Sequence, residues 1–224
     1  GISREQLEQQ LDMATVEQDI EATSFRYGDP YKRIDPATQY IVSAVAHFYN
    51  GSIVFCVRDE DGNRFERGTR QIDVMCSKAR QIEIQIYTDY ILQALDDKWA
   101  THCKQDPFMV AMKGAKYRND FRKGFAEDIH NRLHKMKREE QQNGRQLQIA
   151  DKTVNQSALA VVESNKTEKA IIQKYKDDKY GKLPSKTRLT GAGGDGRNSG
   201  LAAGSSVGLN RQVAGGGQKQ LSGY

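Results

Sequence analysis

Residues 113–142 read KGAKYRNDFRKGFAEDIHNRLHKMKREEQQ. Apolar side chains recur in this stretch at spacings of three and four, which places them on one side of an α-helix. They are Tyr117, Phe121, Phe125, Ile129, Leu133 and Met136. Most of the lysines and arginines fall off this apolar stripe. The stretch therefore predicts a long helix that packs its apolar side on a core and leaves a basic side in solvent.

The basic side of this predicted helix is the candidate binding surface. Lysines and arginines gathered on one face can neutralise the phosphates of DNA or RNA. The seven candidate nucleic-acid-binding residues are Lys116, Arg118, Arg122, Lys123, Arg132, Lys135 and Arg138. No zinc finger, recognition-helix motif or aromatic stacking platform accompanies them, so the expected contact is not sequence-specific. The alternative is a basic face that serves only solubility.

The segments before this helix carry clear start and stop signals. Asp35-Pro36 predicts a helix start, and Asn50-Gly51 its end. Residues 53–57 predict a strand, and Asp59 to Gly62 a hairpin turn. A second strand should return through Phe65 to Met75. Residues 79–103 combine alternation with helical spacing, and their length favours a helix.

The two ends of the chain are more polar. Residues 3–11 predict a short helix, and residues 12–31 a linker or extended arm. Asn143-Gly144 is expected to end the basic helix. Residues 158–162 (ALAVV) predict a short buried strand, and Asn165 begins a further helix with Glu168 as its capping partner. The Gly- and Ser-rich residues 190–224 predict a flexible tail, because they bury too little apolar surface to offset the entropy of ordering.

These elements predict an α+β fold. A small antiparallel sheet, made of the hairpin and open to extension by a third strand at 158–162, should pack against three to four helices. The expected organisation is an N-terminal helix and arm at 1–34, an α+β domain at 35–180, and a basic linker with a flexible Gly-rich tail at 181–224.

Composition sets broad limits. The chain has 224 residues and a formal net charge of +5, with a mean hydropathy of −0.76. Its first 40 residues are acidic, and the basic excess begins near Lys113. The three cysteines lack metal-binding spacing, and Cys56 and Cys76 lie in apolar surroundings, so we expect packed thiols and a reducing compartment. No apolar run is long enough to cross a membrane.

Two features within the basic helix allow sharper predictions. His130 and His134 lie four residues apart, a spacing that puts both rings on one helix face and suits a metal ion. However, the position after the first histidine is Asn131, where metallopeptidase helices have a glutamate, and the neighbouring bases disfavour a dication. Gly124 lies between Phe121 and Phe125, and a glycine inside a helix costs about 1 kcal/mol relative to alanine. We therefore expect another element to approach the helix closely at Gly124.

Four segments of the chain resemble one known family. They are Gly1-Ile2-Ser3; Ala44-Val45-Ala46 with Phe48; Phe121-Arg122-Lys123-Gly124-Phe125-Ala126 with Arg132-Leu133; and Ala158 to Val162 followed later by Gly200, Gly204, Val207 and Leu209. In this order they resemble the bacterial and phage family known as domain of unknown function 2786. The chain has only the end of that family's N-terminal helical repeat, and Asp128 stands where the family often has glycine. The resemblance implies a fold outline and no assigned activity.

Together these observations lead to one expected function and two alternatives. We expect a non-enzymatic bacterial or phage accessory protein that contacts DNA or RNA through the basic helix, without a cofactor, catalytic residues or a membrane. It would lie in the bacterial cytoplasm, or in a virion if a phage encodes it. The first alternative is an assembly protein whose arm and tail order on a protein partner. The second is a metal-dependent hydrolase that uses His130 and His134.

Overall fold

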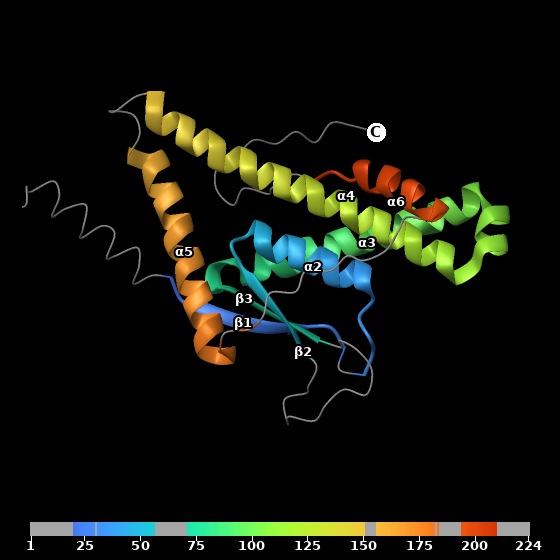
Figure 1. Ribbon diagram of the computed structural model, residues 1–224, viewed down its shortest axis with the longest axis horizontal. Helices are drawn as coiled ribbons and strands as arrows, with labels where there is room; N and C mark the ends of the chain where they lie inside the picture. The colour runs from blue at the N-terminus through green and yellow to red at the C-terminus, as the bar shows by residue number, and fades with distance from the viewer. Residues whose placement is uncertain are drawn as a thin grey trace, which may run out of the picture.

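A computed structural model of the chain describes residues 20–29, 31–56, 71–150, 156–181, 183 and 194–209, without the side chains of 143–150 and 156–163. This part of the chain forms a mixed α+β fold, as predicted. A three-stranded antiparallel sheet lies below a stack of helices, and five α-helices fall within the described residues (Figure 1).

The sheet has the strand order β1-β3-β2, with β1 at Ala22–Tyr27, β2 at Ser52–Cys56 and β3 at Gln71–Ser77. The antiparallel pairing of β2 with β3 confirms the two predicted strands, and the predicted turn at 59–62 lies outside the described residues. Side chains alternate between the two faces of the central strand. Ile72, Val74 and Cys76 join the hydrophobic core, whereas Asp73 and Ser77 are buried polar residues on the other face.

The third strand is β1, and its position corrects two predictions. We expected residues 12–31 to be an arm outside the domain and residues 158–162 to supply the third strand. Instead, Phe25 pairs with Val74 of β3, so the domain begins before residue 35. β1 reads ATSFRY and buries none of its side chains fully. Its sequence does not show the hydrophobic pattern of a strand, because β1 is held in place by hydrogen bonds to the central strand β3 rather than by its own hydrophobicity.

Helices α2 (Pro36–Phe48) and α3 (Gln81–Gln105) lie on the core side of the sheet (Figure 1). Both confirm predicted helices, and a short 3-10 helix, η1 (Lys78–Arg80), leads from β3 into α3. The Asp35 carboxylate caps α2 by accepting hydrogen bonds from the backbone N–H of Ala37 at 2.9 Å and of Thr38 at 3.1 Å.

Helix α4 (Pro107–Ala150) contains the basic stretch but is longer than the predicted 113–142. Its first turns, 107–113, are set off by a bend at Gly114, whose φ of 57° and ψ of −142° interrupt the helix. A positive φ is readily adopted by glycine and costs energy in other residues. At the other end, Asn143 and Gly144 lie within α4, so this pair does not end the helix. Both residues favour turns, but neither excludes a helical conformation.

Helix α5 (Gln156–Tyr180) includes the residues predicted as a strand and as a second helix start. The run 158–162 was ambiguous, because a short apolar run has no periodicity that separates a strand from a buried helical turn. Asn165 lies inside α5 and is not a cap. The helix crosses the polar face of the sheet, where Glu168 accepts a 2.5 Å hydrogen bond from the Ser77 hydroxyl and Lys179 pairs with Asp73 at 2.8 Å.

Helix α6 (Asp195–Ser205) lies within the segment that we expected to be flexible. It packs along α4 (Figure 1). Three glycines four residues apart, Gly196, Gly200 and Gly204, are buried against α4. The contact also confirms the prediction for Gly124, since a Cβ there would lie 2.1 Å from the carbonyl oxygen of Arg197. Glycines give α6 little apolar surface of its own, but they allow backbone-to-backbone packing that holds it in place.

The core lies between the sheet, α2, α3 and α4. Ile41 and Val45 of α2, Ile91 and Leu95 of α3, and Phe125 of α4 are completely buried. Val207 and Leu209, which follow α6, belong to the same core. The packed domain therefore extends beyond residue 180. Cys56 and Cys76 are buried free thiols, as predicted. Among the described helices, none has the length and apolar character needed to cross a membrane.

Candidate nucleic-acid interface

The apolar side of α4 faces the core as predicted. Tyr117, Phe121, Phe125, Ile129 and Leu133 are at most 4% exposed. Helix α6 covers one flank of this stripe and α2 the other. The remaining surface of α4 therefore decides which basic residues can reach a partner.

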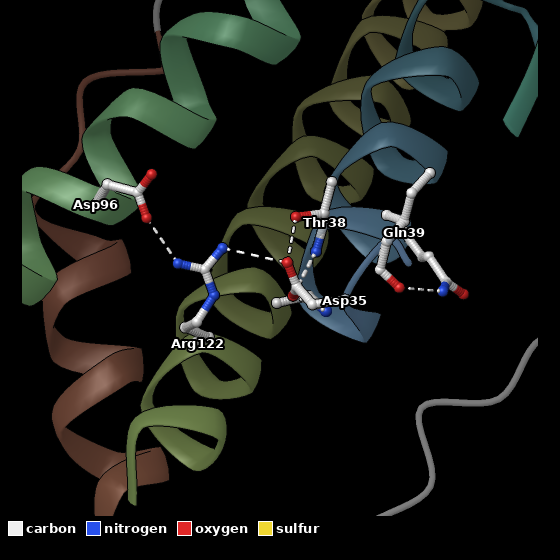
Figure 2. A network of polar contacts seen from close by, with 7 residues as sticks. Asp35, Thr38, Gln39, Asp96 and Arg122 are labelled. Carbon is white, nitrogen blue, oxygen red and sulfur yellow. Dashed lines mark hydrogen bonds and ion pairs between the residues drawn. The ribbon is translucent and has the colours of Figure 1, made fainter. Parts of the chain in front are cut away.

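Arg122 does not point freely into solvent. Its side chain is only 14% exposed, and its guanidinium joins two helices to α4 (Figure 2). Nη1 donates to Asp96 of α3 at 2.6 Å, and Nη2 donates to Asp35 at 3.2 Å. Arg122 thus binds the carboxylate that caps α2, and its positive charge is neutralised by two carboxylates of the same chain.

The same contacts change the pKa of the Asp35 carboxylate. Burial alone would raise its pKa, but the hydrogen bond from the Thr38 hydroxyl and the charge of Arg122 bring the pKa below its ordinary value. Thr38 Oγ1 donates to Asp35 at 2.6 Å (Figure 2). The Asp35 cap therefore stays ionised at neutral pH, where it best accepts the backbone N–H groups of α2.

Arg132 is also committed to an internal role. Its two terminal nitrogens donate at 2.8 Å to the carbonyl oxygens of Gly204 and Val207. These carbonyls lie at and just beyond the C-terminal end of α6, where a helix carries partial negative charge. Arg132 therefore fastens α6 to α4, and it is not available to bind a phosphate without losing these contacts.

The other five candidates remain on the surface. Lys116, Arg118, Lys135 and Arg138 are exposed, and Lys123 is half-buried. Lys135 lies 3.8 Å from Glu139, a separation at which an exposed ion pair contributes little. Among the described residues, the other four have no acidic partner within ion-pair distance. They are Lys116, Arg118, Lys123 and Arg138.

Further cations gather where α2, α4 and α5 meet. Burial lowers the pKa of His47 to about 4, and the neighbouring charges of Lys137, His134 and Lys169 contribute to the shift. Lys137 donates to the carbonyl oxygen of His47 near the end of α2. Arg138 lowers the pKa of His134 in addition to burial and His130. This end of α4 is thus a locally positive region.

The two candidate metal ligands have aromatic neighbours. His130 stacks on Tyr40 with ring centroids 4.3 Å apart, and His134 stacks on His47 at 4.6 Å. The ring centroids of His130 and His134 are 4.2 Å apart. The rings of these two histidines, Tyr40 and His47 therefore form one column between α2 and α4. Within the described ranges, no three residues among His, Cys, Asp and Glu are placed to share a metal ion. The histidines join α2 to α4 through ring stacking.

The ring column should make the protein less stable in mild acid. Burial lowers the pKa of His47, His130 and His134 in the folded protein, so the unfolded chain binds protons first as pH falls below about 6.5. The stability of the neutral column is then lost progressively between about pH 6.5 and about pH 4. We expect the urea midpoint of unfolding to be lower at pH 5 than at pH 7.5.

The matched variant for this experiment is His47→Phe, which keeps a ring beside His134 but cannot be protonated. Its urea midpoint should change less between the two pH values than that of the parent protein. An equal change in both proteins would show that groups other than His47 cause the acid sensitivity.

The chain matches no family model, no curated protein and no solved structure.

The bases of α4 were predicted from the sequence, but the groups that bind Arg122 and Arg132 were not. Asp35 was recognised as a helix cap and not as a partner of Arg122, and Asp96 carried no signal at all. The partners of Arg132 are backbone carbonyls, which a sequence pattern cannot mark.

Proposed function

We propose that this protein is a non-enzymatic accessory protein that binds nucleic acid without sequence specificity through the exposed bases of α4. The observation that carries the proposal is a set of four surface bases, Lys116, Arg118, Lys123 and Arg138, for which the described residues provide no carboxylate within ion-pair distance. At 1.5 Å per residue, Lys116 and Arg138 are about 33 Å apart along the helix. Lys116, Lys123 and Arg138 fall on one side of the helix by its 3.6-residue period, so they could contact several phosphates of one strand over that length.

The internal contacts of the helix support the same proposal. Ion pairs with α3, the α2 cap and α6 keep α4 rigid, so its surface bases would be held in a constant arrangement. Lys113 pairs with Asp195, and Arg197 pairs with Glu127 through bonds of 2.5 and 2.9 Å. A prearranged set of cations loses less entropy on binding a polyanion than a mobile one does.

A relation to the domain of unknown function 2786 family is part of the proposal. Two of the segments that resemble it pack on each other, since Gly200 and Gly204 lie against Phe121 and Phe125 of α4. The segments would then mark one packing unit. The assembly alternative, in which the tail orders on a partner, would apply to residues outside α6, because α6 already packs on its own chain.

Alanine substitution of Lys116, Arg118, Lys123 and Arg138 together should weaken binding of duplex and single-stranded DNA. Fluorescence anisotropy at several salt concentrations would measure it. The slope of log K against log salt should become shallower by about 0.7–0.9 for each phosphate contact that is lost. Failure of the parent protein to bind either DNA at low salt would refute the proposed function.

A second fourfold variant provides a control with the same change in net charge. It replaces Lys98, Lys166, Lys174 and Lys176, which lie on α3 and α5. This control should keep most of the affinity and the salt slope. If both variants lose binding to the same extent, the contact depends on total charge and not on α4.

A further inference from the structure

The corner formed by the end of α3 and the first turns of α4 exposes apolar side chains among bases. Phe108 is 72% exposed and Met112 is 60% exposed. They are four residues apart on the 107–113 turns of α4, a spacing that places them on one face. In Figure 1 this corner projects beyond α2 and the sheet. Neighbouring apolar side chains left in water form a contiguous patch, and such patches occur at contact sites.

The bend at Gly114 separates these turns from the rest of α4. No heavy atom lies within 4 Å of a Cβ built on Gly114, so local packing does not require the glycine. Its φ of 57° does, because it lets the chain change direction between Met112 and Lys116. On the near side of the bend, the Asp106 carboxylate accepts a hydrogen bond from the backbone N–H of Met109 at 3.1 Å and caps the 107–113 turns.

Exposed bases precede and follow these turns in the chain. Lys104 precedes it at the end of α3, and Lys116 and Arg118 follow the bend. In the described part of the chain none of these three has an acidic partner within ion-pair distance. The corner thus combines an aromatic face with a positive rim, which complements a polyanion that also offers flat apolar surfaces.

We infer that this corner binds single-stranded nucleic acid, with Phe108 stacking on a base while Lys104, Lys116 and Arg118 contact the adjoining phosphates. The inference rests on the proposed function and names its substrate class. Base faces are accessible in a single strand and covered by neighbouring pairs in a duplex. Stacking of this kind is tolerant of sequence, because every base has a π-face.

An anionic lipid surface is the competing partner, and the geometry favours it less. The apolar face comprises two large side chains on a helical segment of seven residues, 107–113. Helices that bind membrane surfaces bury a much larger apolar face in the lipid. Stacking by contrast needs a single exposed ring flanked by cations.

The test compares a short oligothymidylate with a duplex of mixed sequence by fluorescence anisotropy. Phe108→Ala should weaken binding of the single strand by roughly 5- to 150-fold, which is the range that loss of one stacked base produces. Binding of the duplex should change little. Ile82→Ala, which truncates a side chain of α3 that is 67% exposed, should leave both affinities unchanged.

Phe108→Trp provides a second, direct readout. It should retain single-strand affinity, and its fluorescence should be quenched by the oligothymidylate. The resident Trp99 packs against Phe121 with ring centroids 5.1 Å apart, so its emission should respond little. Retained single-strand affinity in Phe108→Ala, or unquenched emission in Phe108→Trp, would overturn the stacking role.

Other outcomes separate this inference from the proposed function. If the parent protein binds duplex and single strand equally well and Phe108→Ala changes neither, the single-strand inference fails while the proposed function stands. If it binds neither, both fail. Binding to vesicles that contain phosphatidylserine, lost in Phe108→Ala and without any binding of oligothymidylate, would reassign the corner to a lipid surface.

Discussion

Phe125→Ala should lower the free energy of unfolding by about 3–5 kcal/mol. The Phe125 ring is completely buried in the core where α4 meets α6 and the helices above the sheet. Its removal loses the transfer free energy of a large apolar side chain and leaves a cavity that its neighbours fill only in part. Urea unfolding monitored by circular dichroism would measure the change.

Phe108→Ala is the matched control for this substitution. It removes the same atoms from the same helix, but at a side chain that is 72% exposed. The free energy of unfolding should change by no more than about 0.5 kcal/mol. Similar losses in the two variants would contradict the burial of the aromatic stripe, on which the orientation of the basic surface depends.

Gly124→Ala should destabilise the protein by about 1–3 kcal/mol, although alanine favours a helix over glycine by about 1 kcal/mol. The added methyl group would lie 2.1 Å from the carbonyl oxygen of Arg197. Since this atom belongs to the backbone of α6, relief of the clash requires the whole of α6 to move. Amide hydrogen exchange should therefore rise in α6 more than in α3.

Gly208→Ala tests whether glycine replacement in itself is harmful. A Cβ at Gly208 meets no heavy atom within 4 Å. This variant should unfold at a urea concentration close to that of the parent protein. An increase in stability for Gly124→Ala would contradict the close packing of α6 against α4.

Elements with a strong local signal were predicted from the sequence alone. Asp35-Pro36 and the spacing of Ile41, Val45 and Phe48 define α2, and all three apolar side chains are buried. The stripe of α4 and the close approach at Gly124 were also predicted, because helical periodicity and an unfavourable glycine are properties of the local sequence.

Elements that depend on distant partners were not predicted. β1 was expected to be an arm, since its pairing with β3 joins residues far apart in the chain. Residues 158–162 were expected to be a strand, because an apolar run alone does not distinguish the two structures. Helix α6 was expected to be disordered, since its composition gives no indication that α4 offers a glycine and two phenylalanines to pack against.

The candidate interface divides in the same way. The sequence alone determined that α4 has an apolar side and many bases off that side, because the period of a helix is a local property of the chain. Only the tertiary structure decided which bases remain for a partner. Arg122 donates hydrogen bonds to Asp35 and Asp96, and Arg132 donates to carbonyls of the α6 segment, whereas Lys116, Arg118, Lys123 and Arg138 have no ion pair within the described part of the chain. A charge is available or neutralised according to what lies within a few ångströms of it in space, and chain folding sets that distance.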